Sequence, residues 1–184
     1  MAGRRPIAAA VIMKTLLLLR HGKSSWDAQQ QLDHDRPLAK RGRKAAALMG
    51  RYLTALDEAP EYACSSSAVR ARDTAGRAAQ AGGWSCRIEI SEHLYHASPD
   101  QVLEVVRKTD GGIARLLLAG HEPTWSLLTG RLIGSASVRF PTAAVARIDL
   151  SIENWREADF GRGTLVWLVT PKILERIGWE DALS

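Results

Sequence analysis

The sequence is poor in cysteine: it has two, Cys64 and Cys86, among 184 residues. They do not form a Cys-x-x-Cys pair, and two cysteines are too few for the disulfide framework of a small secreted domain. We therefore expect a reducing compartment and a cytoplasmic protein. The sequence also lacks an apolar run long enough to cross a membrane as a helix, so no membrane partner is expected.

Long tracts of one charge are missing as well. Lys and Arg number 25 against 20 Asp and Glu, which leaves a net charge of +5 at pH 7. The basic residues are spread along the chain, so it has no dense basic segment of the kind that binds nucleic acid, and no nucleic-acid partner is expected. The excess fits either a solvated basic surface or a phosphorylated substrate.

The composition, 46% hydrophobic and 24% charged, is typical of one globular domain. Arg4 and Arg5 precede a short apolar stretch that resembles a weak signal peptide. Lys14 interrupts this stretch, and the leucines after it read as a core strand. We expect residues 1–12 to be an N-terminal extension, with Met13 as the natural start. Residues 13–171 are predicted to form the domain, and residues 172–184 a helical tail.

Short apolar segments alternate with segments of helical periodicity. The predicted strands cover residues 15–19, 61–64, 85–90, 115–119, 144–150 and 164–169. The predicted helices cover residues 38–56, 68–81, 99–108 and 124–133. The serines at 65–67 can cap the second helix, and Gly82-Gly83 can end it. This alternation predicts an α/β fold, a three-layer α/β/α sandwich with a mainly parallel central sheet.

Two histidines, His21 and His121, each follow a predicted buried strand directly. Because ligands bind at the carboxyl ends of parallel strands, both are expected at one edge of the sheet. A neutral imidazole can attack phosphorus, and arginines meet the charge of the transferring group. Arg20 precedes His21, and Arg70 falls in the first turn of a predicted helix, where anions bind favourably. Either histidine alone could be a core residue; the combination predicts a phosphate site.

The residues after His21 are candidates for the same pocket. Gly22 leaves the backbone open to a close approach by phosphate. Lys23 and Ser24 border the histidine, and each contacts either substrate or solvent. Trp26 is a candidate for the pocket entrance.

Several motifs in the sequence resemble those of a known family. Residues 20–27 (RHGKSSWD) resemble the opening motif of the histidine phosphatase superfamily, in its phosphoglycerate mutase-like branch. Residues 35–38 (DRPL) followed by Arg41-Gly42 resemble the SixA-type phosphohistidine phosphatases in particular. Residues 66–75 (SSAVRARDTA) resemble the family's second-arginine motif, and Gly120-His121 resembles its second-histidine motif. The resemblance runs from about residue 14 to 170 with the motifs in the family's order.

The resemblance implies a role for four residues. His21 takes the phosphoryl group, and water later hydrolyses the phosphohistidine. Arg20 and Arg70 hold the phosphate oxygens, while His121 completes the pocket and stabilises charge in the transition state. No metal or organic cofactor is implied.

Two positions depart from the family pattern or stay open. Asp27 stands where mutase-like members often have asparagine, and it is assigned no phosphate contact. Glu92 is a candidate proton donor, because larger members use a glutamate in this region. A leaving imidazole is less basic than an alkoxide and needs less proton assistance, so the reaction can also proceed without it.

Two groups of charged residues have simpler interpretations. The run Asp33-His34-Asp35 contains metal-ligand types, but it lacks the spacing of a closed metal site and reads as a polar loop. Arg72 is expected to form an ion pair on the surface of its helix.

The sequence leaves three functions to separate. The first is a phosphatase for phosphohistidine in a protein or peptide, favoured because the short chain implies an open pocket. The second is a phosphatase or mutase for a small phosphorylated metabolite with the same site. The third is a basic binding module whose site is inactive.

Overall fold

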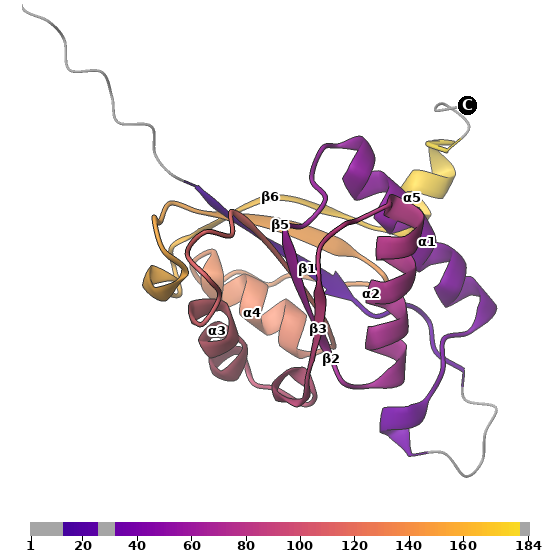
Figure 1. Cartoon of the computed structure of the whole chain (residues 1–184), viewed down its shortest axis with the longest axis horizontal. Helices are drawn as coiled ribbons and strands as arrows, with labels where there is room; N and C mark the ends of the chain where they lie inside the picture. Colours follow the sequence, from indigo (N-terminus) through magenta and orange to yellow (C-terminus); the bar gives the residue numbers. More distant parts are fainter. Residues whose placement is uncertain (1–12, 26–31, 181–184) are drawn as a thin grey trace, which may run out of the picture.

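A computed structural model describes residues 13–25 and 32–180 of the chain (Figure 1). Its strands are β1 (Lys14–Arg20), β2 (Tyr62–Ser66), β3 (Ile88–Ser91), β4 (Arg115–Gly120), β5 (Val145–Leu150) and β6 (Gly163–Val169). Its α-helices are α1 (Lys40–Ala55), α2 (Val69–Gly82), α3 (Pro99–Arg107), α4 (Thr124–Leu132) and α5 (Pro171–Arg176). Short 3-10 turns form η1 (Asp33–Asp35), η2 (Glu92–Leu94) and η3 (Trp155–Glu157). None of the helices in the described ranges has the length and apolar character needed to cross a membrane.

The six strands form one sheet in the order β3-β2-β4-β1-β5-β6. Strands β3, β2, β4 and β1 are parallel, and β5 runs antiparallel to both of its neighbours. The predicted α/β fold with a mainly parallel sheet is therefore confirmed. The carboxyl ends of β1, β2, β4 and β6 meet at one edge, which is the edge where the sequence places the candidate site.

Strand β1 lies at the centre of two hydrophobic cores. Its four leucines, residues 16–19, are fully buried and point alternately to the two faces of the sheet. Leu16 and Leu18 belong to the core under α3 and α4, whereas Leu17 and Leu19 belong to the core under α1 and α2. Figure 1 shows these helix pairs on opposite sides of the sheet. Each buried leucine contributes about 1.5–3 kcal/mol relative to exposure, so both faces must be covered and three layers result.

Helices α1 and α2 approach each other closely. A Cβ atom on Gly50 of α1 would lie 2.0 Å from the carbonyl oxygen of Ala78, so only glycine fits there. Helix α2 ends at Gly82, and Gly83 takes the left-handed backbone conformation expected of a helix end, with φ of 65°. This contact fixes the position of α2, which carries Arg70 in its first turn.

The predicted serine cap of α2 is wrong. Helix α2 begins after Ala68, which has no side-chain hydrogen bond to offer. The hydroxyl of Ser66 accepts only a long contact, 3.4 Å, from the Ala68 N–H, and Ser67 bonds His34 instead. Ser66 and Ser67 do not cap the helix because their hydroxyl groups form hydrogen bonds with ring nitrogens of His121 and His34 instead.

The predicted helical tail is shorter than expected. Helix α5 ends at Arg176, and Gly178 follows with a φ of 59° that breaks the helical path. Residues 181–184 lie outside the described residues. So do residues 1–12, and with them the proposed extension; Met13 as the start of the domain stays a prediction.

Candidate active site

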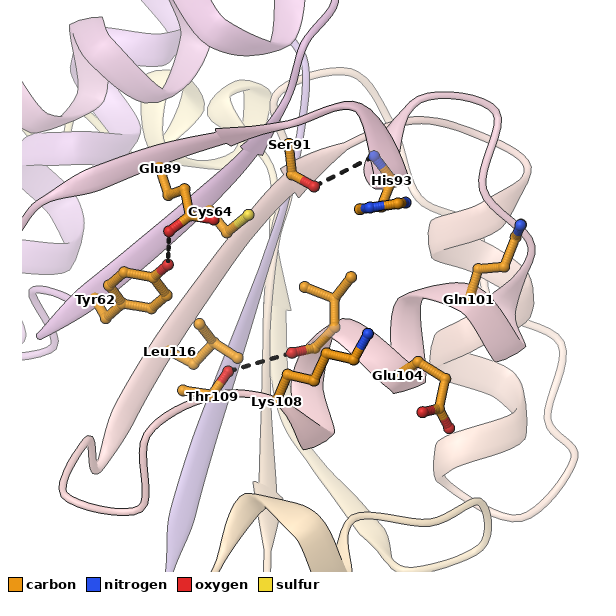
Figure 2. A pocket seen from close by; sticks show the side chains of 11 residues that line it. Tyr62, Cys64, Glu89, Ser91, His93, Gln101, Glu104, Lys108, Thr109 and Leu116 are labelled. Carbon is orange, nitrogen blue, oxygen red and sulfur yellow. Dashed lines mark hydrogen bonds between the residues drawn. The ribbon is translucent and has the colours of Figure 1, made fainter.

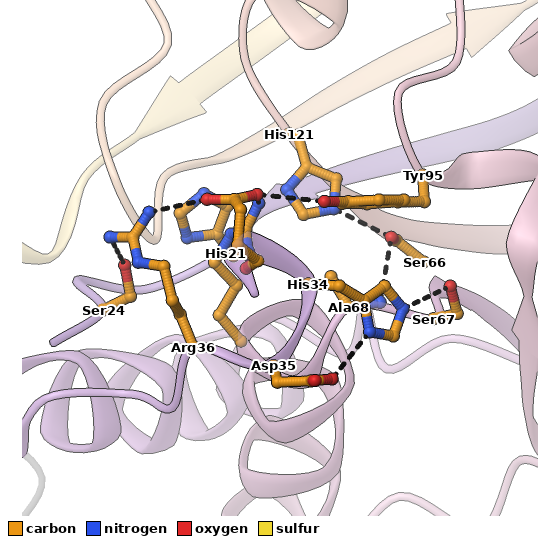
Figure 3. A network of polar contacts seen from close by, with 12 residues as sticks. His21, Ser24, His34, Asp35, Arg36, Ser66, Ser67, Ala68, Tyr95 and His121 are labelled. Carbon is orange, nitrogen blue, oxygen red and sulfur yellow. Dashed lines mark hydrogen bonds and ion pairs between the residues drawn. The ribbon is translucent and has the colours of Figure 1, made fainter. Parts of the chain in front are cut away.

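The two histidines meet at the edge of the sheet (Figure 3). Strands β1 and β4 are paired with Arg20 opposite Gly120, so the residue after each strand occupies the same position on neighbouring strands. The backbone N–H of His21 donates to the Gly120 carbonyl at 3.0 Å. The imidazole centroids of His21 and His121 are 5.1 Å apart. The sequence prediction that these side chains lie together is therefore met by the geometry.

The His21 ring is held in one tautomer. Its Nδ1 atom lies 2.7 Å from the carbonyl oxygen of Gly22, and a carbonyl only accepts, so Nδ1 carries the hydrogen. This leaves the lone pair on Nε2. Burial, the largest cause, acts together with the positive charges of Arg70, Arg20 and Arg36 to lower the pKa of His21 to about 4, although the hydrogen bond to Gly22 raises it. The ring is neutral at pH 7, which a nucleophile requires.

His121 is buried and is held through its other nitrogen. Its Nε2 atom lies 2.8 Å from the hydroxyl oxygen of Ser66, at the end of β2. Its Nδ1 atom is buried without a hydrogen-bond partner among the described residues. Burial first, and then the neighbouring His21 and Arg70, lower the pKa of His121 to about 3. The site thus contains two neutral imidazoles surrounded by permanent cations.

Arg70 projects from the first turn of α2 into the site and is 6% exposed. Its two terminal nitrogens donate to one residue, Asp33: one to the backbone carbonyl at 2.5 Å and one to the carboxylate at 2.9 Å. The guanidinium of Arg20 donates to the carbonyl oxygen of Phe140 at 2.7 Å, and burial lowers its pKa. Both predicted arginines therefore lie close enough to His21 to act on its charge.

Asp33 holds the polar network together. Its carboxylate accepts hydrogen bonds from Arg36 at 2.9 Å, from Arg70 at 2.9 Å and from the Tyr95 hydroxyl at 3.0 Å. Partial burial alone would raise the pKa of Asp33, but the bonds from Arg36 and Tyr95 and the Arg70 charge outweigh it and lower that pKa to about 2. Asp33 is therefore an anion at neutral pH, placed where two arginines converge.

Arg36 is a third cation of the site. Beyond its bond to Asp33, it donates to the Ser24 hydroxyl at 2.6 Å, and its charge reaches His21. Ser24 therefore supports a cation, and it is itself buried. Arg36 lies in the DRPL motif, but the sequence did not predict a role for it in the site. Its basic side chain beside a conspicuous polar loop was the available signal.

Gly22 has a packing role in this structure. A Cβ on Gly22 would lie 2.8 Å from the Gly42 carbonyl oxygen, and a Cβ on Gly42 would lie 2.2 Å from that of Lys23. The Gly22 N–H donates to the hydroxyl of buried Thr74 at 2.9 Å, and Thr74 donates to the Arg70 carbonyl at 2.6 Å. The loop after His21 is thereby attached to α1 and α2.

The remaining candidates either form no side-chain hydrogen bond with this group or lie outside the described residues. Glu92 is exposed at the start of η2, and its part as proton donor stays a prediction. Trp26 and Asp27 lie outside the described residues. Arg72 makes no ion pair with any residue that the structure describes, contrary to expectation, because its exposed side chain has no acid placed to meet it.

The Asp33-His34-Asp35 turn has a different use from metal binding. Within the described ranges, no three His, Cys, Asp or Glu side chains are grouped so that they could hold a metal ion. Asp33 bonds the arginines, and His34 links Asp35 to Ser67 through hydrogen bonds of 3.0 Å on each side. The turn is a polar connection between the loop and α2.

Comparison with known proteins agrees with this geometry. The family model of the histidine phosphatase superfamily (branch 1) matches residues 16–98. An uncharacterised protein of Mycobacterium tuberculosis is 32% identical over 164 residues, covering 84% of this chain and 100% of that protein. An uncharacterised chloroplastic protein of Arabidopsis thaliana is 31% identical over 156 residues, covering 80% of this chain and 71% of that protein.

Solved structures extend the likeness to the whole fold. The protein histidine phosphatase SixA in complex with tungstate superimposes with a TM-score of 0.76 at 25% identity, covering 87% of this chain and 99% of SixA. A mycobacterial glucosyl-3-phosphoglycerate phosphatase shares the fold with a TM-score of 0.61 at 16% identity, covering 84% of this chain and 97% of that one. The chain therefore belongs to branch 1 of the histidine phosphatase superfamily, is of the SixA type, and is a phosphatase.

Proposed function

We propose that this phosphatase removes phosphate from phosphohistidine in a protein or peptide, through a covalent intermediate on His21. The first step forms a bond between His21 Nε2 and phosphorus and breaks the bond between phosphorus and the substrate imidazole, which takes one proton from solvent and leaves as neutral imidazole. In the second step the oxygen of water bonds to phosphorus and the bond to Nε2 breaks. The protons of water go to the released phosphate and to the buffer, and His21 returns to its neutral state.

The cations around His21 supply most of the catalysis in this scheme. The transferring phosphoryl group carries charge on three oxygens, and Arg20, Arg70 and Arg36 surround its acceptor with permanent positive charge. His121, neutral and oriented by Ser66, borders the same space. The fixed tautomer of His21 means that no rearrangement of the nucleophile precedes attack.

The observation that carries the choice of phosphohistidine is the state of Asp33. The Asp33 carboxylate accepts hydrogen bonds from Arg70 and Arg36, and its pKa of about 2 keeps it ionised at neutral pH. It cannot donate a proton to a leaving group at that pH. An alkoxide leaving group needs such a proton more than an imidazole does. Unless Glu92 supplies that proton, which the Glu92→Gln variant tests, the site is better suited to cleaving a phosphorus–nitrogen bond.

A phosphatase panel tests this proposal. Wild-type protein and His21→Ala are compared on a phosphohistidine peptide, a sugar phosphate and an aryl phosphate. We expect kcat/KM to be highest for the phosphohistidine peptide, and the His21→Ala variant to lose activity on all three. Brief reaction with radiolabelled substrate followed by alkaline quenching should label the wild type only. Full activity of His21→Ala would refute the mechanism, and a preference for the sugar phosphate would assign the site to a small metabolite instead.

A further inference from the structure

A separate cavity of about 220 Å³ lies against the backbone of the His21 loop. We call it the basic cavity. It is enclosed by the start of α1, by the segment 139–143 before β5, and by the start of α5. Its charged lining consists of Lys23, Arg41, Arg139, Lys172 and Glu175.

Backbone contacts place this cavity at the same edge of the sheet as the histidines. Ala143, in its wall, donates its N–H to the His21 carbonyl at 3.1 Å. The Lys23 carbonyl accepts from the Ala39 N–H at 2.9 Å, and the absent Cβ of Gly42 allows that contact. The wall segment also borders a cavity of about 530 Å³ that contains Arg20. The basic cavity therefore adjoins the nucleophile loop and the cavity that Arg20 lines.

The charge of the basic cavity is unbalanced. Four cations and one acid line it, and none of the four cations forms an ion pair or side-chain hydrogen bond with another residue in the described part of the chain. Arg107, Arg131 and Arg147 each pair with a carboxylate, whereas Arg72 pairs with none that the structure describes, so what sets the four cations apart is that they line one cavity. Cations that line one cavity repel one another, so their grouping around it favours the binding of an anion there.

A second cavity, on the face of the sheet under α3, has a different charge. It measures about 370 Å³ and lies between β2, β3 and α3 (Figure 2). Glu89, Glu104 and Lys108 line it, together with neutral side chains such as Gln101. It has no excess of cations and offers no comparable site for an anion.

We propose that the basic cavity binds a second anionic group of the substrate, a phosphate or a carboxylate on the same molecule whose phosphoryl group reacts at His21. Lysine and arginine bind both kinds of oxyanion through charge-assisted hydrogen bonds. The volume is below the 300–1,000 Å³ typical of whole-ligand pockets, so it fits one group of a larger molecule. This inference rests on the proposed function and narrows its substrate class to phosphorylated molecules that carry a second oxyanion. The second oxyanion is either another phosphate of the same molecule or an acidic side chain beside a phosphohistidine.

Binding of unreactive analogues tests the second site without relying on turnover. Calorimetry measures Kd for a methylphosphonate reference, for alkane bisphosphonates from propane to octane, and for phosphonocarboxylates of the same lengths. We expect at least one length to bind about tenfold more tightly than the reference. The double variant Arg41→Gln with Lys172→Gln should remove that gain, because it leaves only two of the four cations.

The matched control removes the same charge elsewhere. Lys44→Gln with Arg77→Gln neutralises an exposed lysine and an exposed arginine on α1 and α2, outside the cavity lining. This control should keep the gain. A gain with bisphosphonates assigns the second group as phosphate, one with phosphonocarboxylates assigns it as carboxylate, and a gain with both supports the shared chemistry.

Two results would overturn the second site. One is the absence of any gain at every length in the wild type, and the other is a gain that persists in the Arg41→Gln, Lys172→Gln protein. Failure of the phosphatase panel is a separate result, because analogue binding requires neither a nucleophile nor a leaving group.

Discussion

Replacing Asp33 with asparagine should strengthen the binding of free phosphate. Both terminal nitrogens of Arg70 donate to Asp33, and Arg36 donates to the same carboxylate. A phosphoryl group arriving at His21 must compete with this internal anion for the two guanidinium groups, and the anion also repels it. Asparagine retains the shape and a carbonyl oxygen that can accept from Tyr95, but it removes the negative charge.

The size of the effect follows from the electrostatics of Asp33. The fall in its pKa from 3.8 to about 2 corresponds to at most about 2.4 kcal/mol of favourable interaction. The Asp33 side chain is 45% exposed, so solvent screening reduces this to about 1 kcal/mol. Releasing that interaction should improve phosphate affinity about fivefold.

The assay is competitive inhibition of aryl phosphate hydrolysis by inorganic phosphate, with Asp35→Asn as the control. Asp35 lies in the same turn but bonds His34 and not the arginines, so its variant should leave the inhibition constant unchanged. The pKa of Asp33 is lowered, so its carboxylate is fully ionised and holds the arginines at any pH above its ordinary pKa, and it loses this contact only as the pH falls toward 2. The difference in inhibition constant between Asp33→Asn and the wild type should therefore be constant from about pH 5 to 8. Weaker phosphate inhibition of Asp33→Asn would refute the reasoning and would show that Asp33 instead positions Arg70 for the ligand.

Three further predictions concern the imidazoles and the open question of the proton donor. Ser66→Ala should lower kcat about tenfold with little change in KM, because His121 loses the hydroxyl that orients it; an unchanged kcat with Ser66→Ala would remove that role. The acid limb of the pH profile of kcat/KM should report a pKa near 4 for His21 rather than 6.5, because protonation of the nucleophile abolishes activity. Activity should reach a plateau from about pH 5.5 upward, and a half-maximal point near pH 6.5 would contradict the burial argument. Glu92→Gln should change hydrolysis of a phosphohistidine peptide less than about twofold, whereas a loss of tenfold or more would identify Glu92 as the proton donor.

The parts of the site that follow strand ends could be predicted from sequence. Leu16 to Leu19 are apolar on both faces, which is typical of a central strand, and the same holds for the leucines before His121. Parallel pairing then leaves little freedom for where the next residue lies. The antiparallel direction of β5 was not predicted, because a short apolar strand carries no mark of its direction.

The parts that depend on a loop could not be predicted. Asp33 and Arg36 reach the site because the chain folds back over α2, and no periodicity records that path. Ser66 was read as a helix cap because local hydrogen bonding is the commoner use of serine before a helix. The hydroxyl of Ser66 instead contacts Nε2 of His121, which follows β4 and lies 55 residues away in the sequence.

The pairing of β1 with β4 has a consequence for how the site tolerates change. Parallel neighbours lie about 4.8 Å apart, and the two imidazole centroids, carried by residues that follow a matched pair, are 5.1 Å apart. The spacing of the paired strands thus sets the distance between the two imidazoles. Substitutions in the surrounding core leave that spacing intact as long as the strands stay aligned. Inserting one residue within either strand would move its histidine out of register with the other, so the chain could still fold while the two imidazoles no longer met.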